Sequence, residues 1–171
     1  MESVKISTGK FGMNYGIILG VVMIALSVIG YVTGQTLEGA QWPQLLYYII
    51  FPVVIIFAIS KYKKHNANTL TLGEAIKLGV IIAMISAIVY IIYGLLFNYV
   101  IDPEFMGQMK EVVRDQMLEN PNLTQDQVDQ QMVWVEKMMS PVIGSAFWIA
   151  ASAIFGLIWS LIGGLVMKSS Q

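Results

Sequence analysis

The sequence predicts an all-α integral membrane protein with four transmembrane helices and an extracytoplasmic amphipathic helical hairpin between the third and the fourth. Three observations lead to this prediction. The 171 residues are 56% hydrophobic and 12% charged, whereas about 25% of the residues in an average soluble domain are charged. The apolar residues lie in long blocks, and one polar insert near the C-terminal third has the spacing of amphipathic helices. We treat residues 1–171 as a single four-helix membrane domain.

The apolar blocks have lengths suited to a bilayer. A helix needs about 20 predominantly apolar residues to cross a hydrocarbon core of roughly 30 Å. Four stretches reach or approach that length, and we place the spans at about residues 13–33, 44–60, 76–100 and 142–167. The second span is short and contains Pro52, and Lys77 lies at the start of the third.

The lysines predict the orientation of these spans, because positively charged loops tend to stay cytoplasmic. In a four-span topology, three basic residues lie on the side of the insert: Lys110, Arg114 and Lys137. Seven lie on the other side: Lys5, Lys10, Lys61, Lys63, Lys64, Lys77 and Lys168. We therefore expect both termini in the cytoplasm and the insert, residues 101–141, outside it.

Small residues spaced four apart predict which spans pack closely, since lipid provides little hydrophobic drive for helix association. Three spans have such stripes, namely Gly12, Gly16 and Gly20; Ala75, Gly79, Ala83 and Ala87; and Ser152, Gly156, Ser160 and Gly164. The second span has none. We expect spans one, three and four to form the tight core and span two to pack more peripherally.

The insert has the start and stop signals of two helices. Asp102 and Pro103 are typical of an N-cap and a first helical residue, and Thr124 with Gln127 has the spacing of a capping box. Apolar residues recur at helical spacing in both halves: Met106, Met109, Val113 and Met117, then Val128, Met132, Val135 and Met139. We expect a helical hairpin, which is the part of the chain best placed to meet another protein.

The composition excludes several classes of function. The chain has no Cys, so thiolate catalysis and cysteine-based metal centres are excluded. Arg114 is the single arginine, and the net charge of −1 gives no basic stripe for nucleic acid. The sole histidine, His65, lies in a lysine-rich loop outside the predicted spans. We expect no enzymatic activity, no catalytic, cofactor-binding or metal-ligating residues, and no cofactor.

Two alternatives to a noncatalytic interaction protein remain open. A small-solute permease or channel subunit acting as an oligomer would use polar residues in the spans, such as Tyr93 and Asn98. A Met-based extracytoplasmic metal binder would use the thioethers of the insert, because these soft ligands suit Cu(I). Six of the eleven methionines lie there: Met106, Met109, Met117, Met132, Met138 and Met139.

Two motifs resemble a known family. They are Thr69-Leu70-Thr71-Leu72-Gly73-Glu74-Ala75-Ile76-Lys77-Leu78-Gly79 entering the third span, and Ile101-Asp102-Pro103-Glu104-Phe105 leaving it. With the amphipathic insert and the glycine-rich last span, they make the chain similar to the bacterial domain-of-unknown-function family 4199. The resemblance implies a multi-pass protein of the bacterial inner membrane and transfers no site residues. The expected partners are the lipid bilayer and either another protein or a second copy of the chain.

Overall fold

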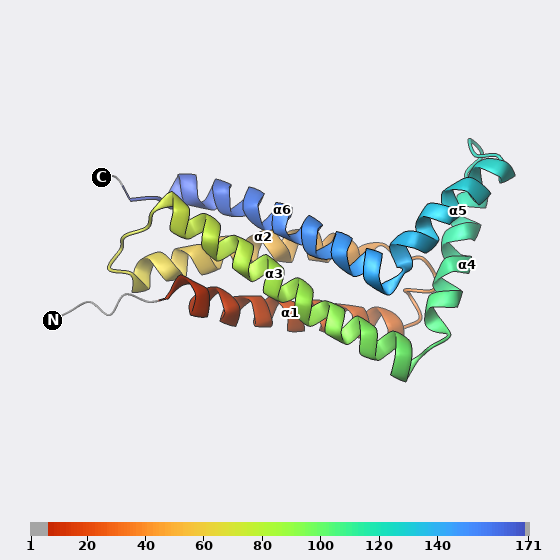
Figure 1. Ribbon diagram of the computed structural model, residues 1–171, viewed down its shortest axis with the longest axis horizontal. Coiled ribbons are helices and arrows are strands. Elements are labelled where there is room, and N and C mark those ends of the chain that lie inside the picture. The colour runs from red at the N-terminus through yellow and green to blue at the C-terminus, as the bar shows by residue number, and fades with distance from the viewer. Residues whose placement is uncertain (1–6, 170–171) are drawn as a thin grey trace.

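The computed structural model describes residues 7–169, so Lys5 lies outside the described part of the chain. The described residues form α-helices and one π-helical segment, without strands. Four helices are long and apolar enough to cross a membrane. They are α1 (Thr8–Val32), α2 (Trp42–His65), α3 (Leu72–Leu96) and α6 (Pro141–Met167), and they lie side by side as an elongated bundle (Figure 1). The described residues thus contain the expected four helices of membrane-spanning length and apolarity.

Helix caps move the observed boundaries away from the predicted ones. α3 begins at Leu72, four residues before the predicted span, because Thr71 and Glu74 form a capping box at its start. α1 begins at Thr8, where the Ser7 hydroxyl accepts a hydrogen bond from the Lys10 amide. α2 continues to His65, five residues beyond the predicted end. Hydropathy locates only the apolar part of a span, and the polar ends of these helices extend past it.

The glycine stripe of α1 packs against branched side chains of α3. A Cβ added at Gly16 would lie 2.7 Å from the Ile85 Cβ, and one added at Gly20 would lie 2.7 Å from the Val89 Cγ1. Gly12 meets Ile81 in the same way. These three glycines therefore form a groove that accepts one row of α3 side chains.

The opposite face of α3 packs its own small residues against those of α6. A Cβ added at Gly156 would lie 2.5 Å from the Ala83 Cβ and 2.8 Å from the Gly79 carbonyl oxygen. Gly164 is similarly close to Ala75. α3 is therefore the central helix, and the predicted close packing of spans one and four on span three is confirmed. The expectation that span two lies outside the core is wrong, because α2 supplies fully buried residues.

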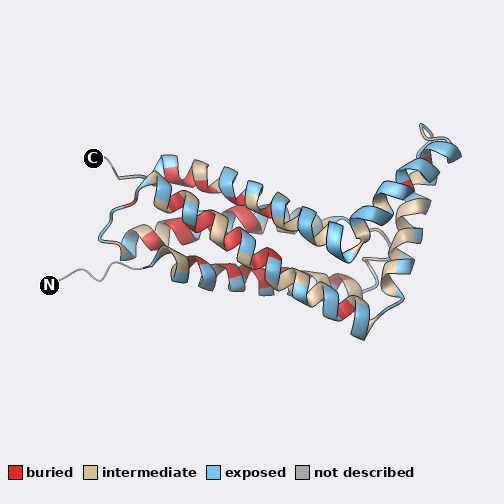
Figure 2. Cartoon of the chain, viewed as in Figure 1, coloured by how far each residue is buried: buried red, intermediate tan, exposed pale blue. Residues whose placement is uncertain are grey.

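α2 contributes to the core with large side chains. Five of its apolar residues are fully buried: Phe51, Ile55, Ala58, Ile59 and Tyr62. Figure 2 shows that most buried residues lie in the part of the bundle nearer the chain ends. The same end is joined by polar contacts, since Tyr62 bonds to Thr8 and the Lys63 ammonium donates to the Met167 carbonyl at 2.8 Å.

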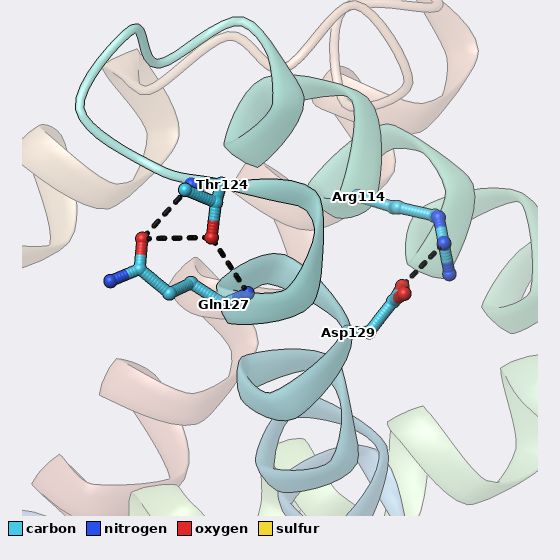
Figure 3. A network of polar contacts seen from close by, with 4 residues as sticks. All are labelled: Arg114, Thr124, Gln127 and Asp129. Atoms are coloured by element: carbon cyan, nitrogen blue, oxygen red, sulfur yellow. Dashed lines mark hydrogen bonds and ion pairs between the residues drawn. The ribbon is translucent and has the colours of Figure 1, made fainter.

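Two short helices extend from the other end of the bundle (Figure 1). They are α4 (Phe105–Leu118) and α5 (Gln125–Met139), and they contact each other. The tip of this α4–α5 unit is held by the Thr124–Gln127 capping box and by an Arg114–Asp129 ion pair at 2.6 Å (Figure 3). Val128 and Met132 are its buried apolar residues. The unit therefore has a very small core of its own.

Candidate functional site

A cavity of about 920 Å³ lies where the α4–α5 unit joins the bundle. Its walls come from α3, the following π-helical segment η1 (Phe97–Ile101), α4, α5 and the start of α6. Its volume lies within the range of about 300–1,000 Å³ that is typical of small-molecule sites. The apolar part of the lining includes Ile91, Leu95, Met106, Met138 and Met139.

Two polar atoms in this lining are buried and have no hydrogen-bond partner. They are the Asn98 Oδ1, an acceptor, and the Trp148 Nε1, a donor. A buried polar group without a partner destabilises a protein by about 1–3 kcal/mol, so most such groups in folded proteins are bonded. Both atoms have less than 1 Å² of accessible surface, so a group in the cavity does not reach them.

Asn98 lies in the π-helical segment that follows α3. The Asp102 amide donates to the Phe97 carbonyl over five residues at 2.8 Å, which is the π-helical pattern. Such segments occur frequently at functional sites. Nothing in the sequence distinguishes these five residues from a continuing α-helix, so the π-helix was not predicted.

An aromatic cluster fixes the base of α4 to α1. The Tyr31 ring centroid lies 4.8 Å from that of Phe97 and 5.4 Å from that of Phe105. The Tyr31 hydroxyl also donates to the Asp102 Oδ2 at 2.9 Å. The predicted cap is partly wrong, since α4 begins at Phe105 and not at Pro103, although the Asp102 Oδ1 does accept from the Phe105 amide at 3.1 Å.

The base of α5 is joined to α6 through Ser140. Its hydroxyl donates to the Lys137 carbonyl at 2.7 Å and accepts from the Ile143 amide at 3.4 Å, so one residue ends α5 and begins α6. Gly144 lies directly against the Met138 carbonyl, where a Cβ has no room. Both ends of the α4–α5 unit are therefore firmly attached, and the cavity lies between them.

Tyr90 and Trp148 separate this cavity from a smaller one. Their ring centroids are 6.1 Å apart, and both residues also line a second cavity of about 290 Å³ between α1, α2, α3 and α6. Ser27 of α1 lines the smaller cavity together with Tyr90. The two cavities thus share an aromatic wall formed by Tyr90 and Trp148.

Two opposite charges line the larger cavity on the side of the α4–α5 unit. Lys110 comes from α4 and Glu136 from α5. Within residues 7–169, the Arg114–Asp129 pair is the one ion pair within 4 Å, so Lys110 and Glu136 do not neutralise each other. The Arg114 and Asp129 side chains are 42% and 50% exposed, and a pair at such a position adds little stability.

The structure brings together some of the polar and sulfur-containing residues singled out in the sequence. Tyr90, Asn98 and Ser145 line the larger cavity, as do Met106, Met138 and Met139. Tyr93 packs against Tyr90 and Phe97 and is not among the lining residues. Ser86 and Ser160 donate to carbonyls of their own helices. A permease would use the polar residues of this lining, and a metal binder would use its methionines.

Several lining residues carried no signal in the sequence. Trp148 lies within an apolar span, where an aromatic residue has no special meaning, and Lys110 and Glu136 are 26 residues apart on an ordinary charged surface. His65, by contrast, is exposed as expected, with its Nδ1 2.8 Å from the Lys61 carbonyl. Within the described residues, no three His, Cys, Asp or Glu side chains form a group suited to a metal ion.

Comparison with known proteins supports the resemblance seen in the motifs. The model of the family described as "Protein of unknown function (DUF4199)" matches residues 14–169. No curated protein and no solved structure matched the chain. The family match covers all four membrane-spanning helices from Asn14 onward and the α4–α5 unit. The chain therefore belongs to the DUF4199 family.

Proposed function

We propose that this protein is a noncatalytic accessory protein of the bacterial inner membrane that contacts a protein partner through the α4–α5 unit. In this proposal both termini are cytoplasmic and the α4–α5 unit is an extracytoplasmic hairpin. The observation that carries the proposal is the position of the unit, which extends from the bundle while its two ends are held rigidly. A rigid projection presents its side chains in a fixed arrangement, which favours specific contact.

The surface of the unit combines exposed apolar residues with acidic ones. Trp134 is 63% exposed and Val133 is 51% exposed, and the Lys137 ammonium lies 4.8 Å from the Trp134 ring centroid. Tryptophan is enriched among the residues that dominate interface energies. Residues 101–141 carry eight acids against three bases. The partner surface expected from this chemistry is apolar at its centre and basic at its edge.

Photo-crosslinking in native membranes tests the proposal. A photo-crosslinker at Trp134 or at Leu118, both exposed on the unit, should link to the same partner protein. Two positions serve as controls. Ile158 of α6 is exposed on a span and should link to lipid, and Gln116 packs against Gly39 of the α1–α2 loop and should give internal links.

Charge reversal on the unit tests whether the partner surface is basic. Asp115→Lys with Asp126→Lys changes two exposed acids of the unit and should lower the yield of the partner crosslink, because like charges then oppose each other across the interface. Recovery of lipid and self-crosslinks alone from Trp134 and Leu118 would overturn the proposal. An unchanged yield after charge reversal would overturn the basic character of the partner surface.

A further inference from the structure

The end of the bundle that carries the chain ends is strongly basic, and we call it the lysine-rich end. Its six lysines within residues 7–169 belong to the polar ends of the spanning helices or follow them directly: Lys10, Lys61, Lys63, Lys64, Lys77 and Lys168. Glu74 is the one acid among the described residues of these four helices and the α2–α3 loop. Its carboxylate already accepts hydrogen bonds from the Thr71 amide at 2.9 Å and the Thr71 hydroxyl at 3.0 Å.

No described carboxylate neutralises these lysines. Within residues 7–169, the single ion pair within 4 Å lies on the α4–α5 unit, at the other end of the molecule. The Lys63 ammonium donates to the Met167 carbonyl at 2.8 Å, so its charge lies next to the residue that precedes Lys168. Positive charges from several helices therefore gather without a counter-charge, and their summed field attracts anions. Four of the six side chains are exposed, namely Lys10, Lys64, Lys77 and Lys168.

Two of these lysines show that the charges lie where the hydrocarbon of a bilayer ends. The Lys61 ammonium lies 5.2 Å from the ring centroid of Phe57, and Phe57 is 51% exposed on a membrane-spanning helix. An exposed apolar ring on such a helix faces lipid chains, and a lysine beside it directs its ammonium to the headgroups. Lys77 follows the first residue of α3 by five positions, which is about 8 Å along a helix axis. The lysines therefore lie on the sides of the bundle, at the depth of the lipid headgroups.

We propose that the lysine-rich end binds anionic phospholipids of the surrounding leaflet in preference to zwitterionic ones. A lysine ammonium is a point charge that suits a phosphate, and basic residues next to a spanning helix attract anionic headgroups. Phosphatidylethanolamine adds an ammonium that the same lysines repel, whereas phosphatidylglycerol does not. The position of the lysines on the sides of spanning helices favours lipid over a soluble acidic protein, which would meet only the tip of the bundle. This surface lies at the opposite end from the α4–α5 unit and is independent of the partner proposed above.

Electron paramagnetic resonance of spin-labelled lipids tests this preference with the full chain and no protein partner. The purified protein is reconstituted into phosphatidylcholine vesicles that contain a trace of chain-labelled phosphatidylglycerol or phosphatidylethanolamine. The motionally restricted fraction of each label gives its relative association constant, and both leaflets are sampled, so the orientation of the chain does not matter. One lysine near the surface corresponds to about a fivefold preference. Because lipid positions elsewhere around the bundle dilute this effect, phosphatidylglycerol should associate about twofold more tightly or better. Salt at about 1 M should remove the difference by screening.

Lysine substitutions assign the preference to this end of the bundle. Lys64→Gln with Lys168→Gln removes two exposed charges and should lower the ratio of the two association constants. Adding Lys10→Gln and Lys77→Gln should bring the ratio close to that of an uncharged surface. Lys110→Gln with Lys137→Gln is the matched control, because it removes two lysines from the α4–α5 unit, and it should keep the parental ratio. Equal association of the two lipids with the parent would overturn the proposal, as would an equal loss of preference in the control and in the Lys64→Gln, Lys168→Gln protein.

Discussion

Single glycines decide how closely α1 and α3 approach each other. At Gly16 the nearest atoms to an added Cβ include the Ile82 carbonyl oxygen at 2.9 Å, which is backbone and cannot rotate away. Close approach of this kind replaces the hydrophobic drive that is missing in lipid with van der Waals contact. Two other single residues lower the stability of the fold, because Asn98 Oδ1 and Trp148 Nε1 are buried without hydrogen-bond partners.

A comparison of two glycine substitutions tests this packing. Gly16→Ala should lower the free energy of unfolding by about 1–3 kcal/mol, the usual effect of overpacking a tight interface. Gly94→Ala is the matched control in a span, since nothing lies within 4 Å of a Cβ added there. Reversible unfolding in mixed micelles measures both. Equal stability of the two variants would contradict the close packing of α1 on α3.

At the scale of the element, α5 depends on its ends because its buried surface is small. Thr124 accepts from the Gln127 amide at 3.3 Å, and the Gln127 side chain accepts from the Thr124 amide at 2.9 Å (Figure 3). An exposed helix of 15 residues has marginal stability by itself. The capping box and the Ser140 contacts therefore decide whether α5 stays formed.

Removal of the cap should loosen the start of α5. Thr124→Ala should destabilise the helix by about 1 kcal/mol, which corresponds to about fivefold faster hydrogen exchange of the amides in its first turns. Gln125→Ala is the control, because its side chain makes none of the capping contacts. Exchange in α6 should not change in either variant. A Thr124→Ala protein with parental exchange in α5 would show that tertiary contacts, and not the cap, hold this helix.

At the scale of the whole molecule, the two ends of the bundle differ. The end that carries the chain ends is filled by buried side chains and joined by contacts such as Leu70 to Ser169 at 3.0 Å. The other end contains both cavities and the α4–α5 unit. Six lysines within residues 7–169 gather near the filled end: Lys10, Lys61, Lys63, Lys64, Lys77 and Lys168.

The lysine asymmetry leads to a prediction about orientation. Single cysteines at Thr36, His65 and Asn122 should react differently with a membrane-impermeant thiol reagent, which is straightforward because the parent chain has no Cys. Positions 36 and 122 should be labelled in intact cells, and position 65 should be labelled only after the membrane is opened. Labelling of position 65 in intact cells would reverse the proposed orientation.

The sequence by itself determined the features that depend on near neighbours. The four apolar spans, the Thr71–Glu74 and Thr124–Gln127 capping boxes and the small-residue stripes are all patterns within a few helical turns. Hydropathy and capping act over such distances, so both can be recognised in one chain.

Only the tertiary structure decided which stripe meets which and where the chain leaves space. The α1 glycines face Ile81, Ile85 and Val89, while the small residues of α3 face α6, and no local pattern distinguishes these pairings. The larger cavity is lined by residues as far apart in the sequence as Asn98 and Trp148, which come from η1 and α6. Its physical basis is packing between distant segments, which a one-dimensional pattern does not contain.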